Sequence, residues 1–267
     1  MKVIVLTYSG HLGANYILTH LPKNKDIEIV GIINRSTRWP QIKKRTKRLL
    51  LISGILVGLR FLVLFASLSI AAYLKRVFSK KRRILDADEV AKIHNIPYHD
   101  VLSVNSKSTL EIIKKLKPDL LISNHFEQII EKPLLQIPKI GTINIHPGIL
   151  PKYGGIFPYF WKLLNREKHA GVTIHWMTEK LDDGEIIGIK RFKIKKADTA
   201  VDLLHKSSKV GLKLLNKTLR KIKKGTSQSV CKKGRCKCYT LPTLNQFREF
   251  QATGRRLFSF KKLAKYF

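Results

Sequence analysis

Short apolar runs separated by turns and amphipathic stretches are the feature that most restricts the fold of this 267-residue chain. Four of these runs, at residues 3–6, 26–34, 119–123 and 141–146, have the length of buried strands. Buried strands that alternate with helices form mostly parallel sheets with both faces covered. We therefore expect an α/β fold in which a mostly parallel sheet is doubly wound by helices.

The C-terminal half continues the same pattern. GVTIHWM at 171–177 and the alternating EIIGIKRFKIKK at 185–196 suit two further strands. Two helix starts are also marked, because Ser108 and Glu111 form a capping pair and Asp198 precedes a long stretch with helical apolar spacing. We expect one helix to begin at each of these caps.

Residues 35–83 interrupt the pattern with a basic and apolar segment. Its apolar part, 49–74, lies between basic runs and is long enough to span a bilayer, although Arg60 stands near its middle. A single crossing would separate parts of one sheet, and positive charge on both flanks gives no orientation. We expect a helical hairpin or interfacial helix that binds an anionic membrane surface through 43–83. Two helices packed on the protein or on a second subunit are the alternative.

The composition narrows the class of protein and of partner. An apolar content of 44% excludes a wholly disordered chain. The 52 Lys and Arg residues outnumber 18 Asp and Glu, and the net charge of +34 suits nucleic acid, anionic lipid or phosphorylated substrates. The first apolar run is too short for a signal peptide, so we expect a cytoplasmic protein, peripheral to the cytoplasmic face of a membrane.

The three cysteines cluster in one basic stretch near the C-terminus, at Cys231, Cys236 and Cys238. Their odd number does not suggest a disulfide framework, and without a nearby histidine they form an incomplete tetrahedral metal site. We expect reduced surface thiols and no metal. The expected organisation is one α/β domain at 1–224, interrupted by 35–83, and a short basic extension at 225–267.

Polar side chains stand where the strands end. Asn144 and His146 lie two apart in the strand of INIHPGILPKYGG and therefore face the same side. Thr173 and His175 share a face of the next strand, and Asp182 follows in an Asp-Asp-Gly turn. An amide that polarises a carbonyl, an imidazole that moves protons and a carboxylate that orients it would form an acid–base site. The Asn-x-His pair taken alone is typical of a structural hydrogen-bonded pair.

Three linked motifs, NIHPGILPKYGGIFP, GVTIHWM and LDDGEII, resemble those of the folate-dependent formyltransferases in order and separation. That family includes methionyl-tRNA, glycinamide ribonucleotide and sugar N-formyltransferases. The similarity is good over residues 84–205, holds in outline over 1–34, and is absent over 35–83. It implies a Rossmann-like formyltransferase domain that transfers a formyl group from 10-formyltetrahydrofolate to the primary amine of a small molecule, without a metal.

The resemblance also implies roles for single residues. Asn144 would bind the formyl oxygen, His146 would stabilise its charge and move protons, and Asp182 would orient His146 and accept the amine's proton. Supporting or binding positions would be Thr173, His175 and Tyr153, the folate loop residues Ser123, Asn124, His125, Phe126 and Gln128, and a phosphate-binding turn with Gly10, Gly13 and Asn15. Ordinary strand-to-helix geometry explains the glycines of that turn equally well.

Two departures from the family concern the acceptor. Gly154 stands where the transfer-RNA enzymes commonly carry arginine, and the C-terminal region is too short for their separate barrel domain. We therefore expect an amino sugar or another phosphorylated small amine as the acceptor, with a lipid-linked form suggested by 49–74. Methionyl-tRNA is the alternative acceptor, and a non-catalytic scaffold that binds membrane or nucleic acid is a second alternative.

Overall fold

The computed structural model describes residues 1–36, 84–231, 234 and 236–263, together with isolated positions between 47 and 70. Almost all of the expected insertion at 35–83 lies outside these residues, and so does the membrane-binding segment expected within it. Among the described residues, no helix is both long enough and apolar enough to cross a bilayer.

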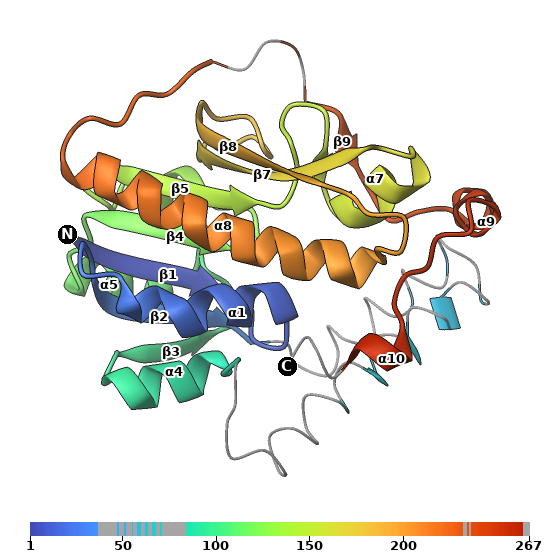
Figure 1. The fold of residues 1–267 in the computed structure, drawn as a ribbon. Coiled ribbons are helices and arrows are strands. Elements are labelled where there is room, and N and C mark those ends of the chain that lie inside the picture. Colours follow the sequence, from blue (N-terminus) through green and yellow to red (C-terminus); the bar gives the residue numbers. More distant parts are fainter. Residues whose placement is uncertain are drawn as a thin grey trace.

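A seven-stranded sheet forms the centre of the protein (Figure 1). In spatial order its strands are β3 (Tyr98–Val101), β2 (Glu28–Arg35), β1 (Lys2–Thr7), β4 (Leu120–Asn124), β5 (Gly141–His146), β7 (His169–Trp176) and β8 (Ile186–Lys193). The first five pair in parallel, whereas β7 is antiparallel to both β5 and β8. The expected mostly parallel sheet is confirmed, with an antiparallel pair at one edge.

Helices cover both faces of the sheet. They are α1 (Leu12–His20), continued by the 3₁₀ turn η1 (Leu21–Lys23), α4 (Ala87–His94), α5 (Lys107–Lys115), α6 (Lys132–Leu135), α7 (Pro158–Leu164), α8 (Ala200–Lys223), α9 (Leu244–Ala252) and α10 (Phe260–Leu263). Successive side chains of β1 point to opposite faces, so Val3 and Val5 pack in the core beneath α1, α4 and α8. Ile4 and Leu6 pack in the core beneath α5 and α6. The doubly wound fold is confirmed.

A third apolar cluster joins the C-terminal segment to the rest of the fold. Phe160 of α7 stacks on Phe250 of α9 with ring centroids 4.7 Å apart, and Phe247 belongs to the same cluster. Two short strands, β6 (Gly154–Gly155) and β9 (Cys238–Tyr239), pair in parallel beside them. Residues from the expected C-terminal extension therefore pack directly against the loop that follows β5.

Both predicted helix caps are wrong by one or two residues. Helix α5 is capped by Ser106, whose side chain accepts a hydrogen bond from the backbone N–H of Thr109, and Ser108 lies inside the helix. Helix α8 is capped by Thr199 with Asp202 in a reciprocal capping box. Asp198 instead accepts from the backbone N–H of Lys195, 2.8 Å away. In both places a neighbouring polar residue, Ser106 or Thr199, has the extended backbone of an N-cap and forms the capping hydrogen bond.

Candidate active site

The polar side chains predicted from the sequence meet at the carboxyl end of β5. Antiparallel pairing places Thr173 of β7 opposite His146, and His175 opposite Asn144. Figure 1 shows β5 between β4 and β7. The pairing register explains why residues 27 to 31 positions apart in the sequence face one site.

Asp182 completes the group from the turn between β7 and β8. Its backbone φ is +49°, which is uncommon for a residue other than glycine, and its side chain is buried. One carboxylate oxygen, Oδ1, lies 3.4 Å from Nδ1 of His146 and 3.6 Å from Nε2 of His175. The other, Oδ2, accepts a 2.7 Å hydrogen bond from the backbone N–H of Gly155. The structure thus brings Asp182 to both imidazoles.

The ring of His146 is held between two acceptors. Its Nε2 lies 2.6 Å from the carbonyl oxygen of Tyr153, and because a carbonyl only accepts, Nε2 carries the hydrogen. In the neutral ring, Nδ1 then presents its lone pair to Asp182 Oδ1. A single proton placed between Nδ1 and Oδ1 would satisfy both atoms. The pair is therefore built to take up one proton.

Burial and charge act in opposite directions on this pair. Burial opposes ionisation of Asp182, but His146, His175 and the Gly155 N–H outweigh it and lower the pKa of Asp182 to about 2. Burial also lowers the pKa of His146, although Asp182 and the Tyr153 carbonyl favour its charged form. Asp182 is therefore a carboxylate near neutral pH, and the charge of His146 depends on the balance between its burial and these two partners.

Asn144 retains a donor for a substrate. Nδ1 of His175 lies 2.8 Å from the carbonyl oxygen of Trp176 and so carries the ring hydrogen. Nε2 of His175 must then accept, and Nδ2 of Asn144 donates to it over 3.2 Å. This contact uses one N–H of the Asn144 amide and fixes its orientation. The second N–H remains to bind developing negative charge on an acyl oxygen.

Thr173 and Tyr153 hold the loop after β5 in place through hydrogen bonds. The Thr173 hydroxyl donates to the Gly148 carbonyl over 2.8 Å and accepts from the Leu150 N–H over 3.2 Å. Tyr153 is buried, and its hydroxyl donates to Glu167 over 2.7 Å, while its carbonyl holds His146. Both residues stabilise the loop after β5, which agrees with supporting rather than ligand-binding positions.

Within the expected folate loop, most polar groups bind the protein itself. The Asn124 amide donates to the Ala14 carbonyl over 2.9 Å. The Gln128 amide accepts from the Val104 N–H and donates to the Leu102 carbonyl, each over 2.9 Å. Ser123 is buried in β4, and Phe126 packs partly into the core beneath α5. These contacts shape the loop.

His125 is the exception in that loop. Its Nδ1 lies 3.1 Å from the Asn124 side-chain oxygen, while its buried Nε2 has no hydrogen-bond partner among the described residues. Burial, followed by the neighbouring His11 and His146, holds the pKa of His125 well below its usual range. The ring lies beside that of His11, and its Nε2 would lie 3.0 Å from a Cβ at Gly13. His125 has the strongest geometric support among the loop residues.

In the predicted phosphate-binding turn, Gly13 and Asn15 lie in the first turn of α1, and their contacts explain both residues without a phosphate. Gly13 is packed so closely that a Cβ there would lie 2.8 Å from Ser208 Oγ of α8. Asn15 donates to Asp86 over 2.6 Å. Gly10 has a φ of +86° and open space around it. His11, which the sequence interpretation missed, caps α1 and lies with its ring centroid 4.4 Å from that of His125.

Gly154 is explained by the C-terminal segment. A Cβ at Gly154 would lie 2.1 Å from Cys236 Sγ, 3.4 Å from Asp182 Oδ2 and 3.5 Å from Cys238 Sγ. A larger residue at 154 would therefore displace β9. Among the described residues, no group of three His, Cys, Asp or Glu side chains is placed to hold a metal ion. The three cysteines are not joined by disulfides.

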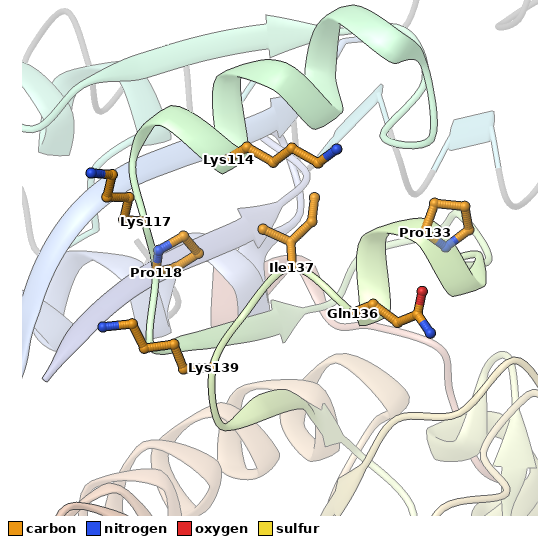
Figure 2. A pocket seen from close by; sticks show the side chains of 7 residues that line it. All are labelled: Lys114, Lys117, Pro118, Pro133, Gln136, Ile137 and Lys139. Carbon is orange, nitrogen blue, oxygen red and sulfur yellow. The ribbon is translucent and has the colours of Figure 1, made fainter.

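A hollow of about 550 Å³ lies at the opposite edge of the sheet (Figure 2). It is lined by Lys114, Lys117, Pro118, Pro133, Gln136, Ile137 and Lys139. These residues precede β4 and β5 or lie in α5 and α6, whereas Asn144, His146 and His125 stand at the carboxyl ends of the strands. Ligands of open α/β sheets bind at the carboxyl ends, so this hollow is not the candidate active site.

The doubly wound sheet, with Asn144, His146 and Asp182 at its carboxyl edge, gives the chain a Rossmann-like α/β fold. A sequence model of the formyl transferase family matches residues 73–219, and the chain belongs to that family.

Two curated relatives illustrate the sequence similarity. The bifunctional polymyxin resistance protein ArnA of Wigglesworthia glossinidia brevipalpis is 36% identical over 160 residues, which is 60% of this chain and 24% of that protein. The methionyl-tRNA formyltransferase of Clostridioides difficile is 36% identical over 148 residues, or 55% of this chain and 48% of that protein. The chain therefore spans between a quarter and a half of the length of these two relatives.

Solved structures share the fold. The phosphoribosylglycinamide formyltransferase of Anaplasma phagocytophilum superposes with a TM-score of 0.61 at 18% identity, covering 91% of this chain and 98% of that one. The N-formyltransferase of Helicobacter canadensis, in complex with folinic acid and dTDP-3-aminofucose, gives 0.58 at 19% identity and covers 92% and 72%. At these identities the likeness establishes the formyltransferase fold alone.

Proposed function

We propose that this protein is an N-formyltransferase that moves a formyl group from 10-formyltetrahydrofolate to a primary amine. The observation that carries the proposal is the contact between His146 Nδ1 and Asp182 Oδ1 at 3.4 Å, beside an Asn144 amide with one N–H to spare. Transfer of an acyl group to an amine needs an oxyanion donor and a proton acceptor in one place. Asn144, His146 and Asp182 supply both.

Each side chain has one step in the reaction. The folate co-substrate supplies an activated formyl group. As the amine nitrogen bonds to the formyl carbon, the Asn144 N–H stabilises the negative charge that develops on the formyl oxygen. The proton that leaves the amine passes to the His146 and Asp182 pair, directly or through water. That pair returns a proton to the folate nitrogen when its bond to the formyl carbon breaks.

The proposed acceptor is an amino sugar or another phosphorylated small amine. Its support is the packing at Gly154, where Cys236 and Cys238 occupy the space that a larger residue would need. The net charge of +34 favours an anionic acceptor. The Helicobacter canadensis relative in fold was solved with an amino-sugar nucleotide, which agrees with this class.

Methionyl-tRNA is the second candidate acceptor. The sequence relatives favour it, because several of them are methionyl-tRNA formyltransferases. Transfer-RNA binding through several phosphate contacts would weaken steeply as salt is raised. A salt titration of transfer-RNA binding therefore separates the two candidates, and an affinity that does not respond to salt would remove transfer RNA.

The function is tested by incubating the protein with 10-formyltetrahydrofolate and candidate amines while the release of tetrahydrofolate is followed. We expect turnover with at least one amine and its loss in His146→Ala and Asp182→Ala. Absence of turnover with every amine, or turnover unchanged in both variants, would favour the non-catalytic scaffold that binds membrane or nucleic acid.

We also propose a peripheral position at the cytoplasmic face of an anionic membrane. Several apolar residues described between 47 and 70 are open to solvent: Leu51 is 74% exposed, Ile55 71%, and Val63 54%. Exposed apolar side chains next to basic runs are typical of segments that enter lipid headgroups. Partition onto anionic vesicles should fall when residues 43–83 are deleted, and equal partition would reject this position.

A further inference from the structure

The side chain of Lys162 is buried among apolar residues. It lies in α7, only 1% of it is exposed, and its neighbours along the helix are Tyr159, Phe160, Trp161 and Leu163, all buried. Lysine is almost never fully buried without a partner, because desolvation of an ammonium group is costly. Such a residue requires a specific reason, and its contacts supply one.

The side-chain nitrogen of Lys162 joins two backbone segments. It donates to the Pro147 carbonyl over 2.9 Å and reaches the Gly171 carbonyl over 3.4 Å. It also lies 5.6 Å from the centre of the Tyr153 ring, at a distance suited to a cation–π interaction. Lys162 thus links the loop after β5 to the start of β7.

The nearest carboxylate is already bound elsewhere. Glu167 accepts hydrogen bonds from Lys152 and from the Tyr153 hydroxyl. Among the described residues, Lys162 forms no ion pair, and Glu167 acts on it only as a more distant charge. The partners of the buried ammonium are therefore carbonyl groups and a ring, rather than a carboxylate that would neutralise it.

Lys162 contacts both ends of the loop at 147–153, and each end adjoins or binds His146. Pro147 follows His146 directly in the chain, so the bond to its carbonyl fixes the backbone next to the imidazole. At the other end of the loop, the Tyr153 carbonyl binds His146 Nε2 over 2.6 Å, and the Tyr153 ring lies beneath the Lys162 nitrogen.

We propose that Lys162 is a positioning residue that holds the loop at 147–153 and thereby sets the orientation and the charge state of the His146 imidazole. The kinetic part of this inference rests on the proposed formyltransferase activity, whereas the effect on His146 does not.

The charged groups around His146 define the expected effect. Asp182 and the Tyr153 carbonyl raise the pKa of His146, while burial, His175 and Lys162 lower it. The charge of His146 in turn helps to lower the pKa of His125. Burial lowers the pKa of Lys162 itself to about 7, so its cation is fully present below neutrality. Removal of this cation should raise the pKa of His146.

The test compares Lys162→Met with Lys162→Arg, which retains a cation, and with Lys152→Met. Lys152 is a matched control, because its nitrogen also lies 5.6 Å from the Tyr153 ring but its side chain is 64% exposed. The titration of His146 is followed by NMR of the histidine rings, with His146→Gln to assign the signal. The values of kcat and KM are measured against pH with an amine that supports turnover.

We expect His146 to titrate at higher pH in Lys162→Met, and the acidic limb of the kcat profile to move in the same direction. At its optimum, kcat should fall by about tenfold because the ring is displaced, with KM for the folate nearly unchanged. Lys162→Arg should restore the parental titration, and Lys152→Met should keep it. If Lys162→Met does not fold, Lys162→Gln removes the charge and retains a hydrogen-bond donor.

A folded variant without the cation whose His146 titrates as in the parent would overturn the inference. A lower kcat with an unmoved pH profile would do the same, because it would indicate a purely structural role. If the parent protein transfers no formyl group at all, while His146 still shifts in Lys162→Met, the proposed function fails and the role of Lys162 stands.

Discussion

The two sides of the candidate site are formed by strands of different length. Asn144, His146, Thr173 and His175 stand on β5 and β7, strands of 6 and 8 residues within the main sheet. The wall beside Asp182 is formed by β6 and β9, which have 2 residues each. Asn144 and His146 are therefore held by the core of the fold, whereas Asp182 lies in a turn beside a wall that depends on a short pairing with the C-terminal segment.

This difference separates two properties of the proposed site. The strands hold the atoms that would react, and the chain superposes on a solved formyltransferase over 91% of its length. The β6–β9 wall meets the site through Gly154 and Gly155, which approach Asp182, and through Tyr239, which stacks on Tyr153. We expect changes in the strand-borne group to reduce the chemical step, and changes in the wall to alter which amine is accepted.

The largest effect should follow from Asp182→Asn. This change retains the shape of the side chain but removes the charge that accepts a proton with His146, so kcat should fall by about 10² to 10³-fold. Steady-state kinetics with the amine found by the acceptor screen measures this loss. Asp183→Asn, at the exposed neighbouring position, is the control and should retain parental kcat. A loss of kcat of less than tenfold in Asp182→Asn would contradict the role of the Asp182 carboxylate in accepting a proton.

Gly154→Ala tests the wall itself. A Cβ at 154 would lie 2.1 Å from Cys236 Sγ, so β9 must move away. We expect KM for the amine to rise by about tenfold, with a smaller change in kcat, because the substrate wall moves more than the reacting atoms. Faster amide hydrogen exchange at residues 236–240 would report the displacement.

A second substitution provides the control for this clash. Cys236→Ala removes the sulfur that meets the new methyl group, so Gly154→Ala with Cys236→Ala should recover parental KM. If Gly154→Ala alone leaves KM and exchange unchanged, β9 is not part of the acceptor wall.

The sheet and the reacting group could be predicted from the sequence because both follow local patterns. Apolar runs of strand length gave β1, β2, β4 and β5, and the two-residue spacing of Asn144 and His146 correctly placed them on one face. The position of Asp182 near His146 came from the resemblance of the turn LDDGEII to its family, whereas its approach to His175 was found in the structure. These features involve neighbours in the chain or motifs with fixed order.

The support around this group depends on contacts that sequence spacing does not encode. Nothing local indicates that Lys162 is buried, or that Cys236 packs on Gly154, 82 positions away. Gly13 and Asn15 fit a phosphate-binding turn by pattern, yet in the structure Gly13 packs against α8 and Asn15 binds Asp86. Long-range packing decided these cases. The predicted caps at Ser108 and Asp198 failed because several polar residues stood within reach of each helix start.

Thr173→Val should affect stability rather than chemistry. The substitution removes the hydroxyl that binds the Gly148 carbonyl and the Leu150 N–H, and leaves both buried groups without that partner. We expect a loss of about 1 to 3 kcal/mol in the free energy of unfolding, measured by urea denaturation. Thr142→Val on β5 is the matched control, because the buried Thr142 hydroxyl has no hydrogen-bond partner among the described residues. Its substitution should be neutral or stabilising, and equal losses at both positions would contradict the role assigned to Thr173.

The smallest effect concerns stability in acid. Because the pKa of Asp182 is lowered to about 2 in the folded protein, from an ordinary value of 3.8, the folded state binds its proton less readily than the unfolded chain. This contribution is fully present above the unfolded value and is lost as pH falls through about 2. Asp182→Asn should therefore flatten the fall in stability between pH 4 and pH 2 by about 1 to 2 kcal/mol, measured by denaturant unfolding across that range. Asp183→Asn should keep the parental slope. If Asp182→Asn also kept the parental slope, the contacts of Asp182 with His146, His175 and Gly155 would not stabilise the charged carboxylate.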